Sequence, residues 1–307
     1  MPASLGRRLC LVLALSAAIV AGASAQASTS RALWVWDPTA LLRDVTARQE
    51  FLEFCRTHGI DVAWLQTTRQ LPGESRLRDE SGWRALLGDA HRAGIRIHAL
   101  DGDPSYVLRE HHYVVLGLVD TIIRFNRSAP ADQRFDGIHL DNEPYLLAGW
   151  DLPVVREQII TDYIELNARA QRAVTAEGGL EYGVDIPFWS MGDATFDGVR
   201  KPASFHLLDL VDNVGIMDFR NVAAGDDGII AHARALLTYG NTTKAKVFVG
   251  VETGPVERVG LPKLTFDGRS NAEMDRELGV AHAAFANDPS YAGFAIHHYL
   301  PYRARFQ

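Results

Sequence analysis

Residues 135–145 read FDGIHLDNEPY, and this segment decides how the rest of the chain is interpreted. It begins as an alternating β-strand in which Ile138 and Leu140 point to one face. His139, Asp141 and Glu143 share the opposite face, so one strand presents three ionisable side chains in the same direction.

Burial of an imidazole and two carboxylates is unfavourable unless these groups are paired or partly hydrated. Pro144 has no N–H to donate to a neighbouring strand, so it ends the strand and places Glu143 at the C-terminal mouth. Stability alone gives no reason for this arrangement, and it therefore indicates a functional site.

Strand patterns alternate with helical patterns from Arg31 onward. Strands are expected at 32–36, 61–66, 96–101, 136–142, 181–187, 213–219, 246–252 and 292–298. Helices are expected at 46–58, 82–93, 111–126, 153–176, 228–239 and 272–285, with a short helical turn at 205–210. This order predicts an α/β fold, a single (β/α)8 TIM barrel whose final helix is short or missing. No Gly-rich phosphate loop follows any strand to favour an open doubly wound sheet, and no cofactor is expected.

The N-terminus has the pattern of a secretory signal peptide, predicted at residues 1–25. Arg7 and Arg8 precede an apolar run at 9–23, which is too short for a permanent membrane span. We therefore predict a secreted or periplasmic protein with no membrane span in its mature form, and a barrel domain at 31–307. Loss of the two leader arginines changes the formal net charge from −7 to −9, which argues against a nucleic-acid partner.

The predicted strand ends combine acids with aromatic rings. A pyranose offers hydroxyl groups to carboxylates and an apolar C–H face to aromatic rings, so this mixture predicts a carbohydrate substrate. The residues expected to bind that substrate are Asn142, Trp36, Gln66, Asp101, His139, Asp185, Trp189, Asp218, Arg220, His297 and Tyr299. Trp34, Trp64 and Trp83 are expected to pack in the core instead.

Glu143 and Glu252 are the predicted catalytic pair, with Asp141 tuning the pKa of Glu143. Glu252 ends the strand at 246–252 on the face opposite its valines, so it is expected to point into the barrel mouth. A retaining glycosidase holds two such carboxylates about 5–5.5 Å apart, and an inverting enzyme holds them about 6.5–9.5 Å apart. The alternative is that Glu252 forms a salt bridge with Arg220 at the rim.

Asn142-Glu143-Pro144, together with Glu252 on the seventh strand, resembles the retaining (β/α)8 glycoside hydrolases of the clan that includes cellulases, mannanases and β-galactosidases. The resemblance implies that Glu143 is the acid/base, Asn142 binds the sugar 2-hydroxyl, and Glu252 is the nucleophile.

The same strand also resembles the chitinase-type pattern D-G-x-D-x-D-x-E. Asp136, Gly137, Asp141 and Glu143 fit this pattern, and His139 replaces its middle acid. In that family the acid is the final Glu, and the N-acetyl group of the substrate attacks, helped by the preceding Asp and a Met-x-Tyr-Asp element on strand six. Strand six here reads MDFR at 217–220, so the Tyr and Asp of that element are displaced.

Two other classes remain open from the sequence. A metal-dependent hydrolase would use His139, Asp141 and Glu143 with His297 or His298, although no His-x-His or His-Glu-x-x-His spacing is present and no metal is predicted. A non-catalytic sugar-binding barrel would keep the fold and the cleft without turnover.

Overall fold

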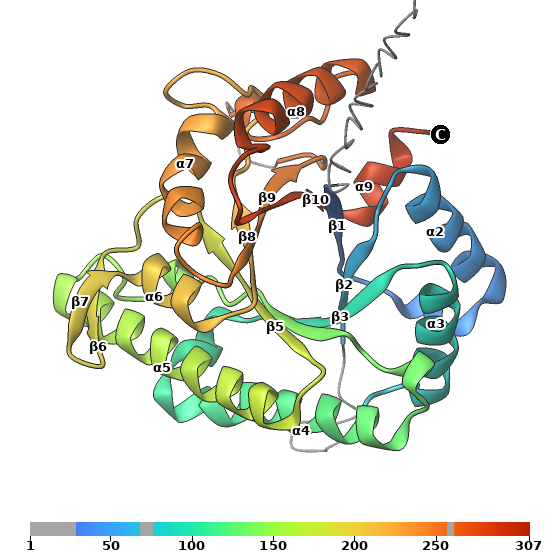
Figure 1. Cartoon of the computed structure of the whole chain (residues 1–307), viewed down its shortest axis with the longest axis horizontal. Helices are drawn as coiled ribbons and strands as arrows, with labels where there is room; N and C mark the ends of the chain where they lie inside the picture. Colours follow the sequence, from blue (N-terminus) through green and yellow to red (C-terminus); the bar gives the residue numbers. More distant parts are fainter. Residues whose placement is uncertain (1–28, 68–75, 257–260) are drawn as a thin grey trace, which may run out of the picture.

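The computed structural model describes residues 29–67, 76–256 and 261–307, and its central feature is a closed parallel barrel. The barrel strands are β1 (Ser30–Val35), β2 (Val62–Gln66), β3 (Arg96–Asp101), β4 (Gly137–Leu140), β5 (Glu181–Pro187), β8 (Asn213–Met217), β9 (Lys246–Glu252) and β10 (Tyr291–His297). Their order around the barrel is β1-β10-β9-β8-β5-β4-β3-β2. Figure 1 shows the helices outside this ring of strands. The predicted (β/α)8 barrel is confirmed.

The helices follow the strands as expected of a barrel. They are α1 (Thr39–Arg43), α2 (Val45–Thr57), α3 (Glu80–Arg92), α4 (His112–Ser128), α5 (Pro153–Glu177), α6 (Ala203–Leu210), α7 (Ile229–Gly240), α8 (Asn271–Phe285) and α9 (Tyr299–Ala304). The final helix α9 has only 6 residues and lies beside α2 (Figure 1). Arg303 of α9 pairs with Glu50 of α2 at 2.8 Å, so the short helix still completes the outer layer.

Two elements differ from the expectation. Helix α1 has 5 residues, which is too short to show a helical period in the sequence. A hairpin of β6 (Asp193–Phe196) and β7 (Val199–Pro202) forms where no strand is expected from the sequence. Asp197 and Gly198 join these strands with φ angles of 49° and 78°, and an Asp-Gly pair is a strong sequence signal for such a two-residue turn. The sequence therefore contains a local signal for this hairpin.

The strands separate two cores. Ile138 and Leu140 belong to the larger core between strands and helices, as their alternation predicted. The smaller core fills the barrel interior around Trp34, Trp64 and Phe248. Trp34 and Trp64 meet edge to face at a centroid distance of 4.6 Å, so the interior is packed rather than open.

The signal peptide predicted at residues 1–25 lies outside the described residues. Within the described part of the chain, no helix combines the length and the apolar character needed to cross a membrane.

Candidate active site

The segment after β4 contains a backbone conformation that a glutamate rarely adopts. Glu143 has φ 27° and ψ 62°, and Pro144 then begins a short 3-10 turn, η4 (Pro144–Leu146). A positive φ at a non-glycine residue costs about 1–3 kcal/mol, and such strain is concentrated at functional sites. The Tyr145 hydroxyl donates a hydrogen bond to Oε2 of Glu143. The backbone therefore stores strain at the residue that the sequence predicts to be catalytic.

Glu143 and Asp141 line a common cavity of about 230 Å³ at the C-terminal ends of the strands. Its other lining residues are Trp34, Trp36, Gly102, Pro104, Met217, Phe219 and His297. The volume lies below the roughly 300–1,000 Å³ of sites for drug-sized ligands, so it suits about one sugar ring. Two carboxylates thus face a small cavity with aromatic walls, as sugar recognition requires.

Asp141 is in an environment that favours its protonated form. Burial raises the pKa of Asp141 well above its usual range, and the charges of Asp185 and Glu143 raise this pKa further. Its Oδ1 atom has no hydrogen-bond partner among the described residues. Two adjacent carboxylates resist ionising together, so the Asp141–Glu143 couple retains a proton that is available for acid catalysis.

Glu252 has a different environment. Its Oε1 accepts hydrogen bonds from the backbone N–H groups of Thr253 at 2.8 Å and Gly254 at 2.6 Å. Its Oε2 lies 2.6 Å from Nδ1 of His297. The indole N–H of Trp36 donates a hydrogen bond to Nε2 of His297 at 2.8 Å, so Nδ1 bears the ring hydrogen and donates a hydrogen bond to Glu252. The carboxylate therefore organises the loop after β9.

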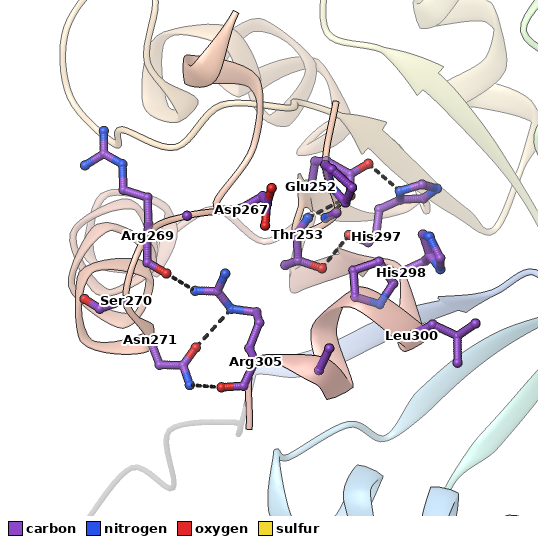
Figure 2. Close-up of a pocket in the computed structure, with 15 residues that line it drawn as sticks. Glu252, Thr253, Asp267, Arg269, Ser270, Asn271, His297, His298, Leu300 and Arg305 are labelled. Carbon is purple, nitrogen blue, oxygen red and sulfur yellow. Dashed lines mark hydrogen bonds and ion pairs between the residues drawn. The ribbon is translucent and has the colours of Figure 1, made fainter. Parts of the chain in front are cut away.

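Glu252 lines a second, larger cavity of about 830 Å³ beside the mouths of β9 and β10. Figure 2 shows Glu252 turned toward His297 in this cavity, with Asp267 and Arg305 on the other side. His297 lines both cavities, whereas Glu252 does not line the one that contains Glu143. The structure therefore does not bring the two predicted catalytic glutamates to one cavity.

His139 and Asp185 were expected to bind the substrate, but both side chains are 0% exposed. Nε2 of His139 lies 2.9 Å from Oδ1 of Asp185, and the imidazole stacks on Trp64 at a centroid distance of 3.8 Å. A sugar in the cavity cannot contact groups buried this deeply, so these two residues act below the site.

Asn142, Asp101 and Gln66 lie near the cavity without lining it. Asn142 is 0% exposed, and its Oδ1 accepts a hydrogen bond from the N–H of Asp103 at 3.4 Å. The Asp101 carboxylate accepts one from the Gly102 N–H at 2.8 Å. Gln66 lines a neighbouring cavity of about 210 Å³ that shares Trp36 with the main one.

An aromatic group extends from the cavity toward the surface. Tyr145 packs edge to face on Trp189 at a centroid distance of 5.0 Å and on Trp150 at 6.5 Å. Trp189 is 38% exposed, which leaves part of its ring available for a sugar beyond the cavity.

Three predicted binding residues take other roles. Asp218 is 0% exposed and lies 2.9 Å from Nδ1 of His232. Arg220 donates to Asp227 rather than to Glu252, so the rim salt bridge considered from the sequence does not form. Tyr299 is 4% exposed and packs edge to face on Phe51 at 5.0 Å in the outer core, away from the cavity.

Asp218 provides a pH-dependent test of this geometry. Burial raises the pKa of Asp218 from 3.8 to about 6, even though His232 and Arg220 act to lower it. Protonation of Asp218 therefore stabilises the folded state. This stabilisation is complete below about pH 4 and is lost as the pH rises through about 6. Between these values we expect the wild type to lose about 2–3 kcal/mol more unfolding free energy than Asp218→Asn. Urea unfolding of both proteins at several pH values measures this, and a constant difference between them would contradict it.

The sequence missed several residues that line the cavity. Trp34 was assigned to the core, and it is indeed 1% exposed, yet it also lines the cavity. Met217, the last residue of β8, and Phe219 just after it also line the cavity, and Tyr145 contacts Glu143. A signal for Tyr145 was its position two residues after Glu143.

Within the described ranges, no three His, Cys, Asp or Glu side chains are grouped so that they could hold a metal ion.

Comparison with known proteins identifies similarity through the fold alone. No protein-family model matches the sequence, and no curated protein matches it either. Among solved structures, the chain is similar to a GH18 chitinase from Pseudoalteromonas aurantia, with a TM-score of 0.57 and 12% identity over 88% of this chain and 94% of that one.

A second similar structure is the PgaB (BpsB) glycoside hydrolase domain from Bordetella bronchiseptica, with a TM-score of 0.52 and 12% identity over 90% of this chain and 95% of that one. The spore cortex-lytic enzyme SleL of Bacillus megaterium matches over 76% of this chain and 53% of its own length, with 14% identity and a TM-score of 0.46. The predicted resemblance is therefore confirmed at the level of the fold, because the chain shares the parallel barrel of glycoside hydrolases, GH18 chitinases among them.

Proposed function

We propose that this chain hydrolyses glycosidic bonds, with Glu143 as the general acid and Asp141 as its partner. The observation that carries the proposal is the cavity at the strand mouths, where these two carboxylates face aromatic walls. The strained backbone of Glu143 and the raised pKa of Asp141 support it, because backbone strain and shifted carboxylate pKa values are concentrated at functional sites. The predicted leader at 1–25 supports export of the enzyme.

The mechanism that fits this site uses the substrate as nucleophile. Glu252 has its oxygens engaged by two N–H groups and His297, so it is poorly placed to attack a sugar in the Glu143 cavity. The D-G-x-x-x-D-x-E arrangement and the fold shared with a GH18 chitinase support attack by a 2-acetamido group of the substrate instead.

In this reaction the proton retained by the Asp141–Glu143 couple passes to Glu143, which leaves Asp141 ionised, and Glu143 donates it to the glycosidic oxygen as the bond to the anomeric carbon breaks. The acetamido carbonyl oxygen bonds to that carbon, and Asp141 accepts a hydrogen bond from the acetamido N–H. Water then attacks the same carbon, Glu143 takes its proton, and the acetamido group is released with overall retention. Phe219 lines the cavity and has no hydroxyl group. The phenol that contacts Glu143 is that of Tyr145.

A panel of oligosaccharides tests the proposal. We expect cleavage of β-linked N-acetylglucosamine oligomers by the wild type, and none of the fully deacetylated or glucose oligomers, which lack the acetamido nucleophile. Mass spectrometry of the products measures this, with the surface variant Glu53→Gln as the matched control. Tight binding without any cleavage would identify a non-catalytic sugar-binding barrel. Cleavage of glucose oligomers would require a protein nucleophile and return Glu252 to that role.

A further inference from the structure

A chain of buried polar side chains crosses the barrel interior beneath the cavity. His139 and Asp185 form its centre, with a 2.9 Å contact between Nε2 and Oδ1 and no exposed surface on either side chain. The other oxygen of Asp185, Oδ2, accepts a hydrogen bond from the indole N–H of Trp34 at 2.9 Å. Trp64 stacks flat on the His139 imidazole, with 10° between the ring planes. Each donor in this buried pair must face an acceptor, because water cannot reach the pair to hydrogen-bond a polar atom that is left unpaired.

Asn213 determines where the protons lie. Its Nδ2 donates to Oε2 of Glu181 at 3.1 Å, which sets the orientation of the amide. Its Oδ1 therefore faces Nδ1 of His139 at 3.2 Å, so Nδ1 must carry a hydrogen. Burial lowers the pKa of His139 to about 3, so the ring is neutral and its Nε2 is an acceptor. The hydrogen between His139 and Asp185 then belongs to Asp185, which is a carboxylic acid rather than a carboxylate.

The neighbouring strands leave space for this pair. His139 of β4, Gly183 of β5 and Asn213 of β8 are register partners, and Asp185 is the partner of Gly215. A Cβ on Gly183 would lie 2.0 Å from Oδ1 of Asn213 and 2.6 Å from Nδ1 of His139. A Cβ on Gly215 would lie 2.1 Å from Oδ1 of Asp185. Two neighbouring strands thus have glycine where the His139–Asp185 pair lies. Any larger residue at these positions would collide with the pair or with Asn213.

Asp185 also faces the charged groups of the cavity. A negative charge on Asp185 would raise the pKa of Asp141. In turn, the charge of Glu143 raises the pKa of Asp185, and the charge of His297 lowers it. The Tyr163 hydroxyl, from α5, donates to the backbone carbonyl of Asp185 at 3.3 Å. An ionised Asp185 would add a third negative charge beside a couple that must lose one more proton during catalysis.

We propose that Asp185, held by His139 and Trp34 as an uncharged acid, is a positioning residue that adds no negative charge beside the Asp141–Glu143 couple under the substrate. The inference rests on the proposed function for the catalytic meaning of the couple, and on the barrel geometry for the protonation of Asp185.

The first experiment measures the protons directly in the mature protein without a substrate. Nitrogen NMR of histidine-labelled protein, with His139→Gln to assign the signal, is expected to show a neutral His139 with its hydrogen on Nδ1 from about pH 5 to 8. Infrared spectra are expected to contain a carboxylic-acid C=O band that disappears in Asp185→Asn and persists in Asp218→Asn at neutral pH. A His139 hydrogen on Nε2, a cationic ring, or an unchanged band in Asp185→Asn would overturn the proposal.

The second experiment measures the consequence for the site. Asp185→Asn retains both hydrogen bonds with a neutral group, whereas Asp185→Leu is similar in size and leaves His139 and Trp34 unpaired. We expect Asp185→Leu to lower kcat on an N-acetylglucosamine oligomer at least about tenfold more than Asp185→Asn, which should keep the wild-type pH profile. Equal losses, or a shifted pH profile in Asp185→Asn, would overturn the positioning role. If the wild type cleaves no glycan, the proposed function fails, while the spectra still decide the state of Asp185.

Discussion

Glu143→Gln is expected to lower kcat for glycan hydrolysis about 10³-fold while leaving the folded structure and ligand affinity largely intact. A glutamine has almost the same shape as glutamic acid and accepts the same hydrogen bond from the Tyr145 hydroxyl. Its amide is not acidic enough to protonate the leaving oxygen, so the bond to the anomeric carbon must break without acid assistance. Steady-state kinetics and calorimetric binding of the same oligosaccharide measure the two effects separately.

Glu252→Gln is the comparison that separates the two glutamates. The glutamine still accepts from the N–H groups of Thr253 and Gly254, but its Nε2 would face the Nδ1–H of His297, which places two donors together. We therefore expect a lower melting temperature and a smaller loss of kcat than in Glu143→Gln. Loss of activity as complete as in Glu143→Gln, with an unchanged melting temperature, would show that Glu252 is the nucleophile.

Gly215→Ala is expected to lower the free energy of unfolding by about 3 kcal/mol or more. The added methyl group would lie 2.1 Å from Oδ1 of Asp185 and 3.2 Å from the Trp64 ring. Neither neighbour has space to move, because Trp64 is 0% exposed and Asp185 is bonded to His139 and Trp34. The alanine therefore adds overpacking to a broken buried hydrogen bond.

Gly279→Ala is the matched control for this prediction. Gly279 lies on α8, and among the described residues a Cβ built there meets no atom within 4 Å apart from its chain neighbours and the nearby backbone of the same helix. Alanine is a better helix former than glycine, so this variant is expected to gain about 0.5–1 kcal/mol. Urea unfolding of both variants measures the contrast. A Gly215→Ala protein as stable as the wild type would show that the His139–Asp185 pair does not occupy the barrel interior as described.

The sequence by itself determined the barrel and the place of Glu143 within it. Alternation along β4 sets the faces of Ile138 and His139, because successive side chains of a strand point to opposite sides whatever surrounds them. Strand β4 ends at Leu140, earlier than the expected stop at Pro144, but parallel strands in a barrel place all their C-terminal ends at one rim, so Glu143 still lies at that rim. These properties depend on the local chain and its order, so they can be read without coordinates.

Only the tertiary structure decided which side chains meet. Glu252 is on the predicted strand and near the predicted rim, yet the two N–H groups that follow it and His297 from β10 hold it outside the Glu143 cavity. His139 reaches Asn213 because Gly183 lies between them in register. Such partnerships depend on how eight strands are staggered around a closed barrel and on the loops that follow them, and no local pattern in the chain encodes that stagger.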